Sequence, residues 1–210
     1  LSASGYVALI GEGLGEMIVR CVPYRGGRSA RRTPLWLNAL FLIGTVATTM
    51  ALGASLTGSE IPWDGWPYAL AILLVLGSHE LGHYMAARAH GLDVSPPLFI
   101  PDFTILFGAG GVGLSPFGTF GALIRMRSLI PNRRALLDVG VAGPLVGIIA
   151  STVAVMVGLG LTPPQVAGPE GGYLILGEPL LFKGLAHLLG VGGENHILHP
   201  VAFAGWVGMF

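Results

Sequence analysis

The residues with the clearest chemical potential are His79, Glu80 and His83, an H-E-x-x-H pattern inside the apolar run from Leu74 to Ala87. Positions four apart on an α-helix project from nearly the same face, so two imidazoles there can hold one metal ion. Zn²⁺ held by two histidines and a third protein ligand lowers the pKa of a bound water toward about 7. Glu80 lies beside that face, where it can take the proton as a general base. The pattern therefore predicts zinc-dependent hydrolysis.

The surroundings of the motif favour a functional site over a chance match. H-E-x-x-H also occurs in soluble helices, where two exposed histidines and a glutamate need no explanation. Here the flanking residues are apolar enough for lipid, and an ionisable group within a bilayer costs on the order of 2.5 to 3.5 kcal/mol on insertion scales. We therefore expect His79 and His83 to bind zinc and Glu80 to act in catalysis.

The composition is that of an integral membrane protein. Of the 210 residues, 52% are hydrophobic and only 10% are charged, against about 25% charged in a soluble domain, and the mean hydropathy is +0.72. The net charge is zero and no long basic run is present, which argues against nucleic acid as a partner. The single cysteine, Cys21, excludes an intrachain disulfide and a paired-thiolate zinc site. Membrane lipid is the expected surrounding.

Three apolar stretches, residues 35–56, 66–88 and 139–161, are long enough to cross a hydrocarbon core about 30 Å thick. Residues 200–210 are predicted to be the first part of a truncated fourth span, and residues 162–199 an outer interfacial region. Residues 1–34 lack the pattern of a signal peptide and form a separate N-terminal segment. The predicted fold is an α-helical polytopic membrane protein with a membrane-embedded core over residues 35–210.

Ten of the eleven basic residues fall on one side of this arrangement. Five arginines precede residue 35, five lie between residues 88 and 134, and Lys183 alone lies elsewhere. Because basic residues beside spans tend to face the cytoplasm, we expect both arginine groups to be cytoplasmic in a multi-pass protein of the cell membrane. At 1.5 Å per residue, His79 lies about 20 Å along its helix from Trp66. The metal site is therefore expected nearer the cytoplasmic face.

Residues 92–134 are apolar, but prolines and glycines interrupt them too often for a regular helix. Non-helical backbone at membrane depth is tolerated only where its polar groups are paired or line a watery cavity. We predict a re-entrant loop with short extended pieces, residues 118–126 (GTFGALIRM) being the best strand candidate. An ordinary cytoplasmic loop resting on the lipid headgroups is the alternative.

A strand in this loop would have a chemical use. A transmembrane helix hides its carbonyl groups in internal hydrogen bonds, so it must unwind before hydrolysis, and a strand edge can pair with the freed backbone by β-augmentation. We predict that Gly118, Thr119, Phe120 and Gly121 bind the substrate. The two glycines would let the two backbones approach closely.

Three motifs together resemble the site-2 protease family of intramembrane zinc metalloproteases: HELGH at 79–83, GTFGALIRM at 118–126 and DVGVAGPLVG at 138–147. The resemblance extends over about residues 36–210. It implies that His79 and His83 are zinc ligands, that Glu80 is the general base, and that the substrate is a transmembrane segment of another protein, cut in regulated intramembrane proteolysis. The family's third ligand is an aspartate in a Leu-Asp-Gly type motif, which this chain lacks. Residues 199–210 resemble the lead-in to that motif, so the third ligand is expected just beyond Phe210.

Four other residues could in principle complete the metal site: Asp138, His187, His196 and His199. For Asp138, stabilisation of the third helix at its N-terminus is the favoured role, and the three histidines belong to the outer region, across the membrane from the metal. Gly140, Gly143 and Gly147 share one helical face and predict close packing against the second span, with a kink at Pro144.

Two other functions remain open from the sequence. A catalytically deficient fragment or pseudoprotease would hold transmembrane segments without cutting them, which fits the missing third ligand. A metal-ion carrier would use the histidines and glutamate as a transport site, but polar groups on several spans and an internal repeat are not evident. The sequence identifies neither the substrate nor the oligomeric state.

Overall fold

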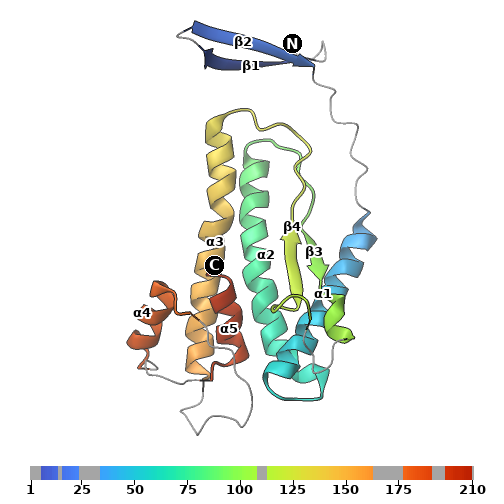
Figure 1. Ribbon diagram of the computed structural model, residues 1–210, viewed down its shortest axis with the longest axis vertical. Coiled ribbons are helices and arrows are strands. Elements are labelled where there is room, and N and C mark those ends of the chain that lie inside the picture. Colours follow the sequence, from blue (N-terminus) through green and yellow to red (C-terminus); the bar gives the residue numbers. More distant parts are fainter. Residues whose placement is uncertain are drawn as a thin grey trace.

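The computed structural model describes residues 6–13, 16–23, 34–107, 113–162, 177–190 and 197–209. Its framework is three long helices, α1 (Leu35–Leu56), α2 (Trp66–Ala89) and α3 (Arg133–Gly160). All three are long and apolar enough to cross a membrane, as predicted for three stretches of the sequence. Figure 1 shows α2 and α3 side by side, with α1 on the other side of α2.

The bounds of these helices follow from local chemistry. Pro34 precedes α1, and its fixed φ of −63° leads directly into the first turn. The 3₁₀ turn η2 (Pro62–Gly65) joins α1 to α2. The third helix begins at Arg133, ahead of the predicted residue 139, because the Asn132 side chain accepts a hydrogen bond from the N–H of Ala135 at 2.8 Å. The prediction began at the first residue of the uncharged run, so it omitted the first turns of the helix, which contain charged residues.

Three buried threonine hydroxyls of α1 are satisfied by hydrogen bonds within the helix. Thr45, Thr48 and Thr49 are fully buried, and each donates to a backbone carbonyl one turn earlier in the same helix. On the side of α2 that faces α1, Tyr68 and Ile72 form a buried cluster with Leu52. This cluster fixes the start of α2, and thereby the height of the H-E-x-x-H turn.

The connection from α2 to α3 contains a small sheet. Strand β3 (Leu98–Pro101) is followed by the 3₁₀ helix η3 (Phe103–Leu106) and by β4 (Thr119–Leu123), which pairs antiparallel with β3. The strand predicted within 118–126 is therefore present, although shorter. The sheet lies against the middle of α1, where a Cβ on Gly44 would come within 3.2 Å of the Pro101 ring.

Two shorter helices follow α3. Helix α4 (Leu180–Leu188) lies within the predicted interfacial region, and α5 (Pro200–Val207) within the predicted fourth span. The Nδ1 atom of His199 caps α5 by accepting from the N–H of Val201 at 3.3 Å. Helix α5 packs closely on α3, because a Cβ on Gly205 would come 2.6 Å from the backbone nitrogen of Val155.

The N-terminal segment contains a hairpin that the sequence patterns did not predict. Strands β1 (Tyr6–Gly13) and β2 (Glu16–Pro23) pair antiparallel, with Tyr6 opposite Pro23 and Gly13 opposite Glu16. Their apolar residues run together instead of alternating with polar ones, so the period-2 signal of a half-buried strand is weak.

Candidate metal centre

The two histidines of the motif converge on one point. His79 and His83 stand one turn apart on α2, and their Nε2 atoms are 3.1 Å apart. Two nitrogens bound to one tetrahedral Zn²⁺, each about 2.0–2.1 Å from it, would be about 3.3 Å apart. The two rings meet edge to face at an interplanar angle of 73°. The pair therefore has the spacing that a zinc ion requires.

A backbone carbonyl of α3 orients one of these histidines. The Nδ1–H of His83 donates to the carbonyl oxygen of Val139 at 2.6 Å. That bond assigns the proton of the neutral ring to Nδ1 and leaves Nε2, which faces Nε2 of His79, unprotonated. Sequence reasoning missed this contact, because every residue has a carbonyl group and nothing in the residue types marks this one.

Glycines on α3 make room for the histidine rings. A Cβ on Gly143 would overlap the imidazole of His83, and a Cβ on Gly147 would come 2.9 Å from Nδ1 of His79. On α2, a Cβ on Gly82 would come 2.5 Å from the carbonyl oxygen of Ala142. These contacts confirm the predicted close packing of the two helices.

The prediction was wrong for Gly140, whose Cβ would meet nothing within 4 Å. Along the antiparallel pair, Gly147 meets His79 and Gly143 meets His83. Gly140 is exposed, so its Cα faces away from the packed side of α3.

Glu80 is partly buried on α2 beside the histidine pair. Its carboxylate has no hydrogen-bond partner among the residues that the structure describes, so both oxygens are available to accept a proton from water. A glutamate in this state is suited to general-base chemistry.

The remaining candidate ligands lie elsewhere. Asp138 accepts a hydrogen bond from Nε2–H of His90 at 2.8 Å and lies 3.9 Å from Arg134. It is not in the first turn of α3, so the predicted stabilisation of the helix N-terminus by its carboxylate is wrong. The reason is that the helix begins at Arg133 and is capped by Asn132. Asp138 instead links the C-terminal end of α2 to α3.

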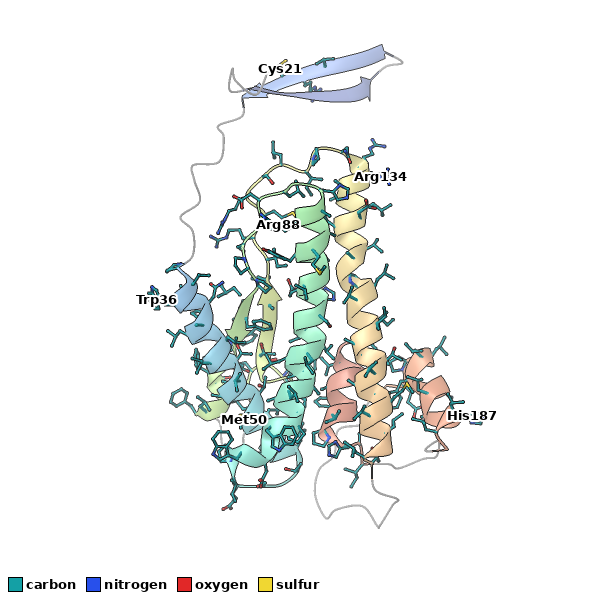
Figure 2. All side chains as sticks on the ribbon, turned by 180° about the vertical axis from the view of Figure 1, so that it is seen from behind. Cys21, Trp36, Met50, Arg88, Arg134 and His187 are labelled. Atoms are coloured by element: carbon teal, nitrogen blue, oxygen red, sulfur yellow. The ribbon has the colours of Figure 1, made fainter. Side chains whose placement is uncertain are left out.

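The histidine candidates are also not brought to the pair. His187 lies on α4, at the end of the molecule opposite Arg88 and Arg134 (Figure 2), and His199 caps α5. His196 falls outside the described residues. Within the described ranges, no group of three or more His, Cys, Asp or Glu side chains could hold a metal ion. Among the described residues, His79 and His83 are therefore the candidate ligands that lie next to each other.

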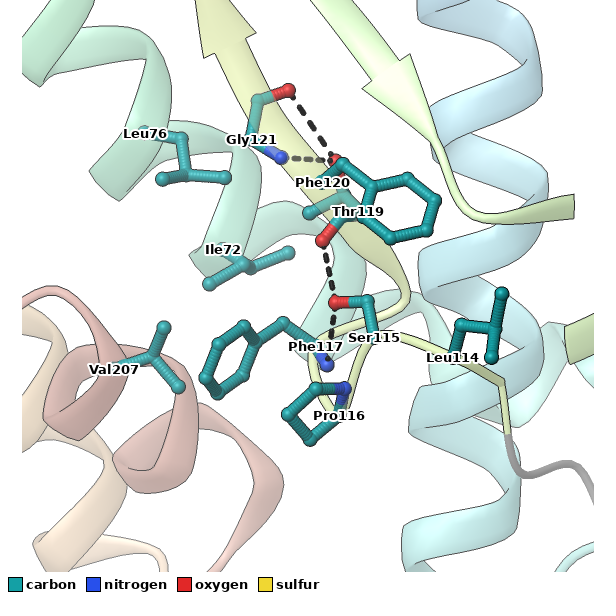
Figure 3. Close-up of a pocket in the computed structure, with 10 residues that line it drawn as sticks. All are labelled: Ile72, Leu76, Leu114, Ser115, Pro116, Phe117, Thr119, Phe120, Gly121 and Val207. Atoms are coloured by element: carbon teal, nitrogen blue, oxygen red, sulfur yellow. Dashed lines mark hydrogen bonds between the residues drawn. The ribbon is translucent and has the colours of Figure 1, made fainter. Parts of the chain in front are cut away.

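An apolar cavity of about 430 Å³ lies between α2, the turn before β4 and α5, as Figure 3 shows. Leu76, one helical turn before Glu80, lines it from α2. Of the predicted substrate-binding residues, Thr119, Phe120 and Gly121 line this cavity. It therefore extends from the edge of β4 toward the turn that carries the motif.

Gly118 does not line the cavity. It has a φ of +73°, and a Cβ there would come 3.1 Å from the carbonyl oxygen of Thr48 on α1. Gly121 has a φ of +97° and open space around its Cβ position. Both positions need glycine for the backbone conformation, and Gly118 allows close approach to α1 instead of to a substrate.

Comparison with known proteins identifies the family. The sequence model of peptidase family M50 matches residues 67–210. The chain belongs to peptidase family M50. This is the site-2 protease family that the three motifs resemble, and the match includes the histidine pair, β4 and the glycines of α3.

Curated M50-type relatives have matching names. "Probable zinc metalloprotease EGY2, chloroplastic" of Arabidopsis thaliana is 32% identical over 178 residues, which are 82% of this chain and 30% of the relative. "Probable zinc metalloprotease EGY1, chloroplastic" of Oryza sativa subsp. japonica is 32% identical over 155 residues, 68% of this chain and 24% of the relative. The chain thus spans less than one third of their length. No solved structure matches the chain significantly.

Proposed function

We propose that this chain forms the membrane-embedded core of a zinc metalloprotease that hydrolyses a peptide bond within a transmembrane segment of a substrate protein. The observation that carries the proposal is the histidine pair on α2, with Nε2 atoms 3.1 Å apart and the His83 ring oriented by the Val139 carbonyl. Membership of peptidase family M50 and the names of the relatives support this chemistry.

His79 and His83 would hold the zinc ion, with a third ligand supplied by the chain that follows Phe210. The course of α5 supports this placement: a Cβ on Gly208 would overlap Val75, one turn before His79, and the Ser151 hydroxyl of α3. Zn²⁺ at this position would supply Lewis acidity and lower the pKa of a bound water. Glu80 would take the proton of the attacking water and return it to the amine nitrogen of the leaving peptide.

The substrate would bind as an extended chain along β4. Strand β4 pairs with β3 on one edge, and Thr119, Phe120 and Gly121 line the cavity next to α2. An unwound transmembrane segment added here would exchange its lost helical hydrogen bonds for those of a strand pair. Its apolar side chains would enter a cavity with predominantly apolar walls.

We further propose that the β3–β4 loop is re-entrant and that α5 begins a fourth span. Gly44, in the middle of α1, contacts Pro101 and Phe103 of the loop, so a membrane crossed by α1 would surround the loop at the same depth. Phe107 and Leu114 are 88% and 78% exposed, which lipid explains better than water.

The distribution of charge suggests the orientation. Figure 2 has Arg88 and Arg134 at one end of the helices and Met50 and His187 toward the other. By the positive-inside rule, the arginine end would be cytoplasmic in a cell membrane, with the active site nearer that side.

The direct test measures zinc and cleavage in the same full-length protein. Purified protein should contain about one Zn²⁺ per chain, in keeping with a single tetrahedral site, and should cut a reporter with a transmembrane segment. His79→Ala and His83→Ala should lose both zinc and cleavage. Zinc retained at wild-type level in both variants would contradict the assignment of the ligands, and zinc binding without any cleavage would favour a pseudoprotease.

A further inference from the structure

Asp102 is a fully buried carboxylate that lies outside the metal centre, between β3 and η3. Its Oδ1 accepts from the backbone N–H of Thr104 at 3.0 Å and from the Thr104 hydroxyl at 2.5 Å. Its Oδ2 accepts from the backbone N–H of Ser115 at 2.6 Å. Among the described residues, no basic side chain forms an ion pair with it. All its donors come from the segment that follows it in the chain.

Because this charge is buried, the N–H of Ser115 must stay within hydrogen-bond distance of it. A buried carboxylate without a counter-ion is costly unless strong hydrogen bonds replace its water, and bonds to an ionised acceptor are among the strongest in proteins. The backbone also wraps closely around the carboxylate, since a Cβ on Gly113 would come 2.5 Å from Oδ2 of Asp102. Displacing Ser115 would therefore remove the hydrogen bond that Oδ2 of this carboxylate accepts.

Ser115 transmits this constraint to β4. Its hydroxyl donates to the carbonyl oxygen of Thr119 at 2.6 Å and accepts from the N–H of Phe117 at 3.2 Å. The hydroxyl of Thr119 then donates to the Ile100 carbonyl at 2.7 Å and accepts from the N–H of Gly121 at 3.1 Å. Figure 3 shows the hydrogen bonds of this network that link Ser115, Phe117, Thr119 and Gly121.

A second anchor holds the same turn from α2. The fully buried Tyr68 donates its hydroxyl to the carbonyl oxygen of Phe117 at 3.0 Å. Ser115, Phe117, Thr119 and Gly121 all line the 430 Å³ cavity, whereas Asp102 does not. Asp102 therefore fixes the wall of the cavity without touching its contents.

We propose that Asp102 is a positioning residue for the substrate-binding strand, fixing the segment Ser115–Gly121 so that β4 presents its edge to an unwound substrate. This inference rests on the proposed protease function. Loss of this positioning should affect the two kinds of substrate differently. If β4 is loosened, cleavage of a helical transmembrane substrate should fall, because its unwound backbone needs a fixed strand to pair with. A short peptide that is already unfolded depends on it less.

The test compares Asp102→Asn with wild type in the full-length protein. The control is Asp93→Asn, because Asp93 is an exposed acid of the same loop, 3.8 Å from Arg127 and outside the network. We expect kcat/KM for a helical transmembrane substrate to fall about tenfold in Asp102→Asn, a loss in keeping with removal of a charged buried acceptor. Cleavage of a short unfolded peptide and zinc content should stay close to wild type, and Asp93→Asn should behave as wild type on both substrates.

Hydrogen exchange separates this inference from the protease function itself. The amides of Thr104 and Ser115 should exchange faster in Asp102→Asn than in wild type, whether or not the protein cuts anything. Absence of cleavage in wild type would refute the protease function, whereas unchanged exchange and an unchanged ratio of the two substrates would refute the role of Asp102.

A milder variant covers the case in which Asp102→Asn loses zinc along with both activities through misfolding. Ser115→Ala keeps the backbone N–H that donates to Asp102. It removes the hydroxyl, and with it the hydrogen bonds to Thr119 and Phe117. It should shift the ratio of the two substrates in the same direction, by a smaller factor. A wild-type ratio in Ser115→Ala would show that the network does not position β4.

Discussion

The His83 imidazole is held by α3 on two sides, through the Val139 carbonyl at Nδ1 and through the backbone of Gly143 beside the ring. Both contacts are made by backbone groups of α3 and not by its side chains. They also mean that the geometry of the metal site depends on α3 as much as on α2, the helix that carries the motif.

A matched pair of alanine substitutions tests this dependence. Gly143→Ala would place a methyl group in the His83 ring, whereas Gly140→Ala adds the same group, one turn away, in open space. Disturbing the group that orients a metal ligand typically weakens metal binding about 10- to 100-fold. We expect that loss in a competitive zinc titration of Gly143→Ala, while Gly140→Ala binds as wild type. Equal affinities in the two variants would show that α3 does not shape the site.

The roles of base and ligand can be separated at Glu80. If Glu80 only moves protons, Glu80→Gln should keep most of the zinc while turnover falls about 10²- to 10⁴-fold. His83→Ala is the comparison, because it should lose zinc and turnover together. Zinc content measured beside single-turnover cleavage decides between them, and equal zinc loss in both variants would identify Glu80 as a ligand.

At the scale of the elements, β4 supplies a test of strand addition. Phe120→Pro removes one backbone N–H from the strand, and Phe120→Ala is its control because it removes the same ring but keeps the N–H. Phe120→Pro should reduce cleavage of a helical transmembrane substrate well below that of Phe120→Ala, with zinc retained. If the two variants cut this substrate equally, the backbone of β4 at this position does not pair with it. Gly121→Val is less informative, since the φ of +97° at Gly121 strains any larger residue.

The cap of α5 predicts a pH dependence. Burial lowers the pKa of His199 below its ordinary value of 6.5, and its Nδ1 accepts from the N–H of Val201 only while unprotonated. Because the unfolded chain then binds the proton more readily than the folded one, the stability due to His199 is complete above pH 6.5 and is lost as the pH falls below it. His199→Asn keeps a capping side chain but does not titrate. The melting temperature of wild type should therefore fall more than that of His199→Asn between about pH 7.5 and 5.5. Parallel curves would show that another group controls the acid response.

The elements differ in how far the sequence determines them. The bounds of helices α1 and α2 were predictable to within a residue or two, because each is a long apolar run with a proline at or near its start. The strand β4 was predictable within GTFGALIRM. Its partner β3, and the register shift between the pairs Phe99–Ala122 and Pro101–Thr119, depend on residues far apart in the sequence. The acceptor for His83 could not be found at all, since a carbonyl of Val139 has the same chemistry as any other.

At the scale of the molecule, contacts made at glycines bring α3 and α5 close to the histidine pair. Gly143 and Gly147 bring α3 onto the histidines, while Gly205 brings α5 onto α3. Three helices thereby converge within a turn of His79. Close packing of this kind is driven by contact area and not by exclusion of water, which suits a protein surrounded by lipid.

Thiol labelling tests the orientation of the molecule in the membrane. Ile61, between α1 and α2, and Leu129, before α3, are exposed uncharged residues, 58% and 55% accessible. Membrane crossings by α1, α2 and α3 would place them on opposite sides of the membrane. Cysteines placed at these positions in a Cys21→Ser background leave all basic residues in place, so the charge distribution that determines orientation is unchanged. In intact cells, an impermeant thiol reagent should label Ile61→Cys from outside, and Leu129→Cys only after the membrane is opened. The reverse pattern would invert the orientation and move the active site toward the other face, whereas labelling of both from one side would contradict the crossing of α2, the helix that carries the histidine pair.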